Sequence, residues 1–164
     1  ANSNNRNRRK VHVGSNYQQL PQTSRSKAEN PRQAATYAVA ASFTELVTAV
    51  GIYTTVDVTA DIFFEQTINI SDKANCVIMS SNGSVFDGQK DVQMIRVSRS
   101  SVEFWNIKFS NGYSEKEGGA LWLYSSTAII VNSTFNNNSA YEAGAVYVEE
   151  SNVTILSSTF ESNS

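Results

Sequence analysis

The chain has 164 residues, of which 40% are hydrophobic and only 17% are charged. It is long enough to bury one core, and it lacks the run of about 18 apolar residues that a membrane-spanning helix needs. The formal net charge of -2 hides an uneven distribution, because most of the basic residues fall in the first 32 positions. We therefore expect one folded domain with a polar extension, without membrane insertion in this segment and without nucleic-acid binding.

Residues 1–32 form a basic, polar arm. Its seven basic residues face a single acidic one, Glu29, which gives a charge of +6, and six basic and fourteen acidic residues give -8 for the rest of the chain. Such a composition is typical of a solvated tail, and it also suits a segment that is held on a partner surface. The second interpretation makes this segment an assembly arm, with Arg6, Arg8, Arg9, Lys10, Arg25, Lys27 and Arg32 as its contact residues.

Residues 33–51 are predicted to form an amphipathic helix. Asn30 is a suitable N-cap, Pro31 suits the first helical position, and Gly51 follows as a stop signal. One apolar face is made by Ala35, Val39, Phe43, Leu46, Val47 and Val50. We expect this helix to cover the open end of the domain that follows, and residues 33–164 to form that domain together.

Residues 52–164 contain an internal repeat of short, alternating strand patterns. GGALWLYSSTAIIVNSTFNNNSAYE is followed by AGAVYVEESNVTILSSTFESNS, and a step of 25 joins Gly119 to Gly144 and Phe135 to Phe160. An earlier step of 26 places Phe109 in the same series. Copies that recur at this period stack in register, so the sequence predicts an all-β chain wound as a parallel β-helix, with about 25 residues per coil and about four coils.

Each copy pairs GGA or AGA with F-x-x-N, at Phe135 to Asn138 and at Phe160 to Asn163. This pattern resembles the GGA[ILV] and FxxN repeats of the chlamydial polymorphic outer-membrane proteins. The resemblance covers roughly residues 56 to 164 and implies an adhesin-like, right-handed β-helix of the pectin-lyase type. From the repeat itself we expect the three phenylalanines to stack in the core, and Asn138 and Asn163 to bind backbone groups at turns.

The chain lacks the residue sets that pectin-lyase-like enzymes use. The only histidine, His12, lies in the arm, so a histidine-based triad is not expected. A calcium-dependent lyase would need clustered carboxylates beside an arginine, for which Glu115, Glu117 and Glu142 with Arg96 or Arg99 are the candidates. Glu117 and Glu142 are 25 residues apart and should stack, which suits either a calcium site or a solvated loop edge, and we favour the solvated edge. We expect no catalytic residues, no metal and no cofactor.

Three outward residues recur at the coil period: Arg96, Trp122 and Tyr147 are separated by steps of 26 and 25. Alternation along the strands sends them to one exposed face, where they should form a ladder. The ladder suits internal cation–π and aromatic stacking, a contact with another protein, or a platform for sugar rings. All three interpretations stay open at this stage.

Two further features bear on location. Five N-x-[ST] sequons begin at Asn69, Asn82, Asn132, Asn137 and Asn152, and they are candidate glycosylation sites of a secreted protein. Cys76 is the only cysteine, so no disulfide forms within the chain, and its apolar neighbours predict a buried thiol. We therefore expect an extracellular or cell-surface location.

The favoured function is a non-enzymatic structural or adhesion module, with self-association or binding of other surface proteins. The alternatives are a polysaccharide lyase or glycoside hydrolase and a glycan-binding module. The last repeat reaches Ser164 with no capping pattern after it. We expect further coils or a stacked second copy to cover that end, and stacked copies joined through the basic arm would build a filament.

Overall fold

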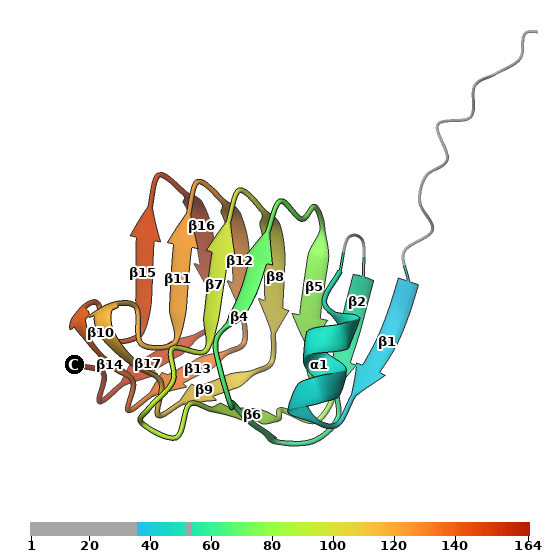
Figure 1. The fold of residues 1–164 in the computed structure, drawn as a ribbon, viewed down its shortest axis with the longest axis horizontal. Coiled ribbons are helices and arrows are strands. Elements are labelled where there is room, and N and C mark those ends of the chain that lie inside the picture. Colours follow the sequence, from blue (N-terminus) through green and yellow to red (C-terminus); the bar gives the residue numbers. More distant parts are fainter. Residues whose placement is uncertain (1–35, 52–53) are drawn as a thin grey trace, which may run out of the picture. The chain divides into compact units, whose positions relative to one another are not determined.

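The computed structural model describes residues 36–51 and 54–164 (Figure 1). Within these residues the chain is a parallel β-helix, as the repeat predicts, because all the paired strands run in the same direction. The seven basic residues of the predicted arm, and the expected helix start at Asn30 and Pro31, lie outside the described residues.

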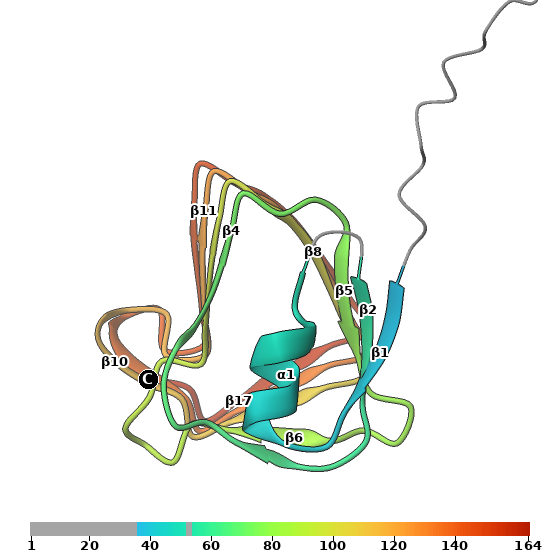
Figure 2. The ribbon, with the colours of Figure 1, turned by 45° about the vertical axis from the view of Figure 1, so that its right-hand side comes forward.

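Three sheets form the sides of the β-helix (Figure 2). The six-stranded sheet contains β1 (Thr36–Ala40), β2 (Thr54–Val58), β5 (Cys76–Met79), β8 (Ser101–Trp105), β12 (Thr127–Val131) and β16 (Asn152–Leu156). The five-stranded sheet contains β3 (Ile62–Phe63), β6 (Val85–Asp87), β9 (Lys108–Ser110), β13 (Thr134–Asn136) and β17 (Thr159–Glu161). The four-stranded sheet contains β4 (Ile68–Ser71), β7 (Ile95–Ser98), β11 (Leu121–Tyr124) and β15 (Val146–Glu149). A two-stranded sheet of β10 (Tyr113–Glu117) and β14 (Ser139–Glu142) bulges from one corner (Figure 2).

The coils stack in the register that the sequence spacing predicts. Leu121 of β11 pairs with Ile95 on one side and with Val146 on the other, and each partner is the equivalent position of a neighbouring coil. Ile95 and Leu121 are fully buried, and Trp122, the next residue in β11, points outward. Alternation along every strand therefore separates a core row from a surface row, as expected for a sheet with one buried face.

A column of phenylalanine rings runs through the core. Phe109 stacks on Phe135 with 4.7 Å between ring centroids and 5° between ring planes, and Phe135 stacks on Phe160 with the same values. Phe109 and Phe135 are fully buried, whereas Phe160 in the C-terminal coil is 45% exposed. Phe86 and Phe64 continue the column toward the N-terminal end. The predicted stack is confirmed.

The turns repeat one backbone conformation from coil to coil. A residue with positive φ follows each strand of the four-stranded sheet, and further positive-φ residues recur at the other corners. The stacked series are Asp72, Arg99, Ser125 and Glu150; Asn106, Asn132 and Ser157; and Asn111, Asn137 and Ser162. Asparagine tolerates this left-handed region better than most residues, which explains why the turns are rich in it.

Asn138 is fully buried at the turn between β13 and β14. Its Oδ1 accepts a hydrogen bond from the backbone N–H of Gly112 at 2.8 Å, and its Nδ2 donates to the carbonyl of Phe109 at 3.1 Å. Asn163 repeats this role one coil later, since its Nδ2 donates to the carbonyl of Phe135 at 3.0 Å. Both asparagines bind backbone groups at turns, as predicted.

The glycines of the GGA repeat are required by close backbone packing. A Cβ atom on Gly119 would overlap the carbonyl oxygens of Gly144 and Ser139. A Cβ atom on Gly144 would overlap the carbonyl oxygen of Ser164 in the same way. The repeat therefore keeps glycine where two coils and the two-stranded sheet meet.

The expected helix over residues 33–51 is wrong in its extent. The helix α1 covers only Phe43–Ala49, and Thr36–Ala40 is instead the strand β1, which pairs with β2. The Oγ1 atoms of Thr36 and Thr54 lie 3.0 Å apart, and the Tyr37 hydroxyl donates to Asp57 at 3.1 Å. Pairing with a sheet edge thus overrides the helical pattern, because it satisfies backbone groups that β2 would otherwise expose.

The helix start has a local signal of its own in Ser42 and Glu45. The Ser42 hydroxyl accepts a hydrogen bond from the backbone N–H of Glu45, and the Glu45 carboxylate accepts one from the backbone N–H of Ala41. The Phe43 ring contacts that of Phe64 edge-on at 5.4 Å, and Leu46 is fully buried. The shorter helix therefore covers the N-terminal end of the core, as expected of a cap (Figure 2).

Candidate functional site

The outer face of the four-stranded sheet carries two rows of side chains in register. The first row is Asn69, Arg96, Trp122 and Tyr147, and the second is Ser71, Ser98, Tyr124 and Glu149. The register places Arg96, Trp122 and Tyr147 on neighbouring strands, so the three residues of the expected ladder lie side by side. We call the surface made by Trp122, Tyr124 and Tyr147 the aromatic face.

Arg96 is held over the ring of Trp122. Its guanidinium carbon lies 4.1 Å from the ring centroid, which is a close cation–π contact. One terminal nitrogen of the guanidinium also donates to Oε1 of Gln93 at 3.3 Å, and Nε2 of Gln93 donates to the carbonyl of Gly118 at 2.7 Å. The buried Gln93 thus anchors the cation to the backbone beside β11.

Tyr124 is a member of this surface that the sequence analysis missed. Its ring stacks on that of Trp122 with 5.7 Å between centroids and 24° between planes. The signal was present, because a residue two positions after Trp122 in the same strand must point to the same side of the sheet. Trp122 is therefore held both by a cation from the preceding coil and by an aromatic ring of its own strand.

Three carboxylates lie around the Tyr147 end of the aromatic face. The nearby charge of Glu149, with burial and the charges of Glu142 and Glu117, raises the pKa of Tyr147 above its ordinary value. Glu117 and Glu142 are paired in register across the two-stranded sheet. This end of the face is therefore negatively charged, whereas Arg96 lies at the other end.

The residues considered for a calcium-dependent lyase are not all brought together. Arg99 follows β7, whereas Glu117 precedes β11, so they lie beyond opposite ends of parallel strands. Glu115 and Glu117 belong to β10 and Glu142 to β14. Within residues 36–51 and 54–164, no group of three acidic, histidine or cysteine side chains is placed to hold a metal ion.

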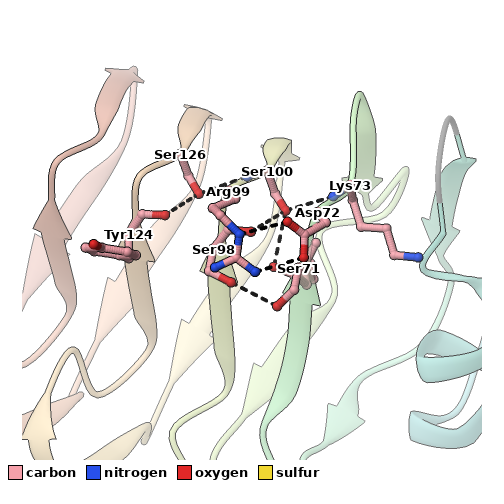
Figure 3. A network of polar contacts seen from close by, with 9 residues as sticks. Ser71, Asp72, Lys73, Ser98, Arg99, Ser100, Tyr124 and Ser126 are labelled. Carbon is pink, nitrogen blue, oxygen red and sulfur yellow. Dashed lines mark hydrogen bonds and ion pairs between the residues drawn. The ribbon is translucent and has the colours of Figure 1, made fainter.

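Arg99 belongs to a polar network that links neighbouring turns (Figure 3). Its Nε and one terminal nitrogen donate to the two carboxylate oxygens of Asp72, at 2.8 and 2.9 Å, and these hydrogen bonds lower the pKa of Asp72. The hydroxyl of Ser126 accepts a hydrogen bond from the backbone N–H of Ser100 at 3.1 Å. The hydroxyl of Ser151 accepts one from the backbone N–H of Ser126 at 2.9 Å. These bonds join each turn to the next, which is a structural role.

A second surface, also missed by the sequence analysis, lies on the six-stranded sheet. Met79, Trp105, Val131 and Leu156 pair in register on its outer face, and we call them the apolar stripe. Trp105 is 40% exposed and Leu156 is 53% exposed. The Trp105 indole N–H donates to the carboxylate of Glu103 at 2.8 Å, so its one polar atom is already satisfied.

The stripe has the same periodic signal as the expected ladder. Its four members occupy equivalent positions in successive coils. Each of them directly follows an inward position of its strand. Met79 and Val131 are half-buried, and a contiguous apolar patch marks a contact surface more often than single exposed apolar residues do.

The five sequon asparagines are all exposed. Three of them lie at turns, where the side-chain amide already donates a hydrogen bond: Asn82 to the carbonyl of Thr59, Asn132 to Asn106 and Asn137 to Asn111. Asn69 and Asn152 lie instead in the strands β4 and β16. Nothing in these positions assigns a glycan to any of them.

Cys76 is fully buried in β5 and is a free thiol. Burial raises its pKa to about 11, because the thiolate would lose its hydration inside the core. The predicted buried thiol is confirmed, and it acts as a small core residue.

Comparison with known proteins returned no match: neither a protein-family model nor a curated protein nor a solved structure matches the chain. Within residues 36–51 and 54–164, no helix is long and apolar enough to span a membrane.

Proposed function

We propose that the chain is a non-enzymatic structural and adhesion module of a cell-surface or extracellular protein. Its rigid β-helix presents flat outer faces to other proteins, further copies of the same chain among them. The observation that carries this proposal is the apolar stripe, in which Trp105 and Leu156 are 40% and 53% exposed, on a sheet whose inward side chains are buried from β2 to β12. Exposed apolar rows on a rigid scaffold favour contacts with other macromolecules.

The nature of the stripe favours a protein partner. The Glu103 carboxylate occupies the indole N–H of Trp105, so the ring offers an apolar surface that needs no further hydrogen bond. Tryptophan is also among the residues that contribute most to protein interfaces. Two such sheets can pack face to face at about 10 Å with their side chains interdigitated, and the equal strand spacing of two copies suits this arrangement.

The polar side chains of the turns favour a structural role over a catalytic one. Arg99 is engaged by Asp72, and the turn serines and asparagines bond to the next coil. The resemblance of the GGA and FxxN repeats to an adhesin-like family, and the exposure of all five sequon asparagines, agree with a surface location.

Sedimentation equilibrium of the full chain tests the proposal. We expect association at physiological salt that weakens when Trp105→Ser and Leu156→Ser are combined, because both substitutions remove apolar area from the stripe. Tyr141→Ser is the matched control, since Tyr141 is 84% exposed in β14, outside the stripe. Equal association of the stripe variant and the wild type would contradict the stripe contact. Cleavage of uronic-acid polymers, with or without calcium, would contradict the non-enzymatic role.

A further inference from the structure

The aromatic face combines partly exposed aromatic rings with negative charge. Trp122 and Tyr124 stack on one strand, and Tyr147 lies on the next. Glu149 pairs in register with Tyr124, Glu117 pairs with Glu142 in the two-stranded sheet, and the charges of all three carboxylates act on Tyr147. Aromatic faces and carboxylates both attract cations. The surface therefore suits a ligand with several positive charges on flexible side chains.

The face already holds one guanidinium of its own chain. Arg96 lies 4.1 Å from the Trp122 ring centroid and is steadied by Gln93. This contact shows that one ring of the face, that of Trp122, accepts a guanidinium. Arginine is also better suited than lysine to such a site, because its planar guanidinium stacks on rings and bonds to carboxylates in a forked geometry.

The chain itself supplies an arginine-rich segment of the required charge. Residues 1–32 carry +6, with Arg6, Arg8, Arg9 and Lys10 close together in the sequence, whereas the remaining residues carry -8. Opposite charges of this size increase the rate at which two copies meet, and they fix the relative orientation of the two copies.

We propose that the aromatic face binds the arginine-rich segment of residues 1–32 from a second copy of this chain. The inference rests on the proposed function as an associating surface module, and it adds a second contact that is distinct from the apolar stripe. Arginine side chains of the segment lie against Tyr124 and Tyr147 and pair with Glu142 and Glu149. The contact is electrostatic in large part, so it weakens as salt is raised.

Association of the full chain in low salt, followed by sedimentation velocity, tests this inference. The variant Glu117→Gln, Glu142→Gln and Glu149→Gln is expected to weaken association by about tenfold or more, because three attractive charges are lost. Tyr147→Ala is expected to weaken it by a smaller factor with no change of charge. The matched control is Glu65→Gln, Asp91→Asn and Glu161→Gln, three exposed residues away from the face, and it should associate as the wild type does.

A charge exchange separates a specific contact from general attraction. Copies with Glu117, Glu142 and Glu149 changed to Lys, and copies with Arg6, Arg8 and Arg9 changed to Glu, should each associate more weakly than the wild type, and their mixture should associate more strongly than either variant alone. Equal weakening by the control triple, or a wild type that stays monomeric in low salt, overturns the inference. Association that survives the face variant but is lost in the stripe variant also overturns it, and leaves the proposed function standing. A different outcome would assign the face to glycans instead. In that case the chain binds neutral oligosaccharides, Tyr147→Ala abolishes this binding, and neither the glutamate nor the arginine substitutions change self-association.

Discussion

The rings of Phe109 and Phe135 stack face to face in the core, 4.7 Å apart, because the two residues occupy equivalent positions in consecutive coils. Pairing of β9 with β13 fixes both backbones in register, so like side chains meet without adjustment. The same relationship, repeated at each strand, produces the core column, the aromatic face and the apolar stripe.

Phe135→Ala should lower the free energy of unfolding by about 3 to 5 kcal/mol, as truncation of a fully buried aromatic ring does. The loss arises from removed apolar contacts and from the cavity left between Phe109 and Phe160. Chemical denaturation followed by circular dichroism measures it. Phe63→Ala is the matched control, because Phe63 is 60% exposed, and its effect should be within about 0.5 kcal/mol. Equal effects of the two substitutions would place Phe135 outside the core.

Asn138→Ala should destabilise the fold by about 2 to 4 kcal/mol, because it leaves the backbone N–H of Gly112 and the carbonyl of Phe109 buried without their partners. The same denaturation experiment measures the change. Asn136→Ala, two residues away and exposed in β13, should be nearly neutral. A neutral result for Asn138→Ala would mean that the buried turn does not depend on its side chain.

The two copies of the glycine repeat give opposite predictions for two small substitutions. Gly119→Ala should destabilise the fold strongly, because its new Cβ atom would overlap backbone oxygen atoms of Gly144 and Ser139. Ala143→Gly should instead be neutral or stabilising by up to about 1 kcal/mol, since Ala143 already has a φ of 52°, which glycine adopts without strain. Thermal melting compares them. Similar melting temperatures for both variants would speak against the close packing at Gly119.

Burial of Cys76 predicts an alkaline loss of stability. The thiol has a pKa of about 11 in the folded chain, above its ordinary value, so between pH 9 and 11 the unfolded chain loses a proton that the folded chain keeps. Stability due to this group is therefore complete below pH 9 and falls as the pH rises toward 11, by about 1.4 kcal/mol for each unit of pKa difference. Denaturation at pH 8 and pH 10.5 measures the fall, and Cys76→Ala should remove this part of it. An unchanged pH dependence in the variant would show that other groups cause the alkaline loss.

Much of the fold was predictable because each strand position returns at a fixed step. The inward rows, the phenylalanine stack and the turn roles of Asn138 and Asn163 all follow from the spacing of the repeat. The strand at Thr36–Ala40 was not predictable in this way, because it precedes the repeat and its helical pattern continues into Phe43–Ala49. Only the edge of β2, a tertiary feature, decides between the two structures.

The candidate surfaces were predictable only in part. The spacing of Arg96, Trp122 and Tyr147 places them on one face, but the stacking of Tyr124 on Trp122 depends on side-chain packing within a strand. The negative charge near Tyr147 depends on Glu149 in the same strand and on Glu117 and Glu142 from a separate two-stranded sheet. That these carboxylates meet near Tyr147 can be seen only once the three-dimensional path of the chain is known.

Deletion of a single coil tests the central claim, that all these surfaces arise from in-register stacking of equivalent coils. Removing residues 121–145 joins Ala120 to Val146, the position equivalent to Leu121, and should leave a cooperatively melting β-sheet protein of lower stability. Removing only residues 121–133 breaks the register and should abolish cooperative unfolding and the β-sheet signal in circular dichroism. If the half-coil deletion melts as cooperatively as the full-coil deletion, or if the full-coil deletion alone fails to fold, the stacking account is contradicted.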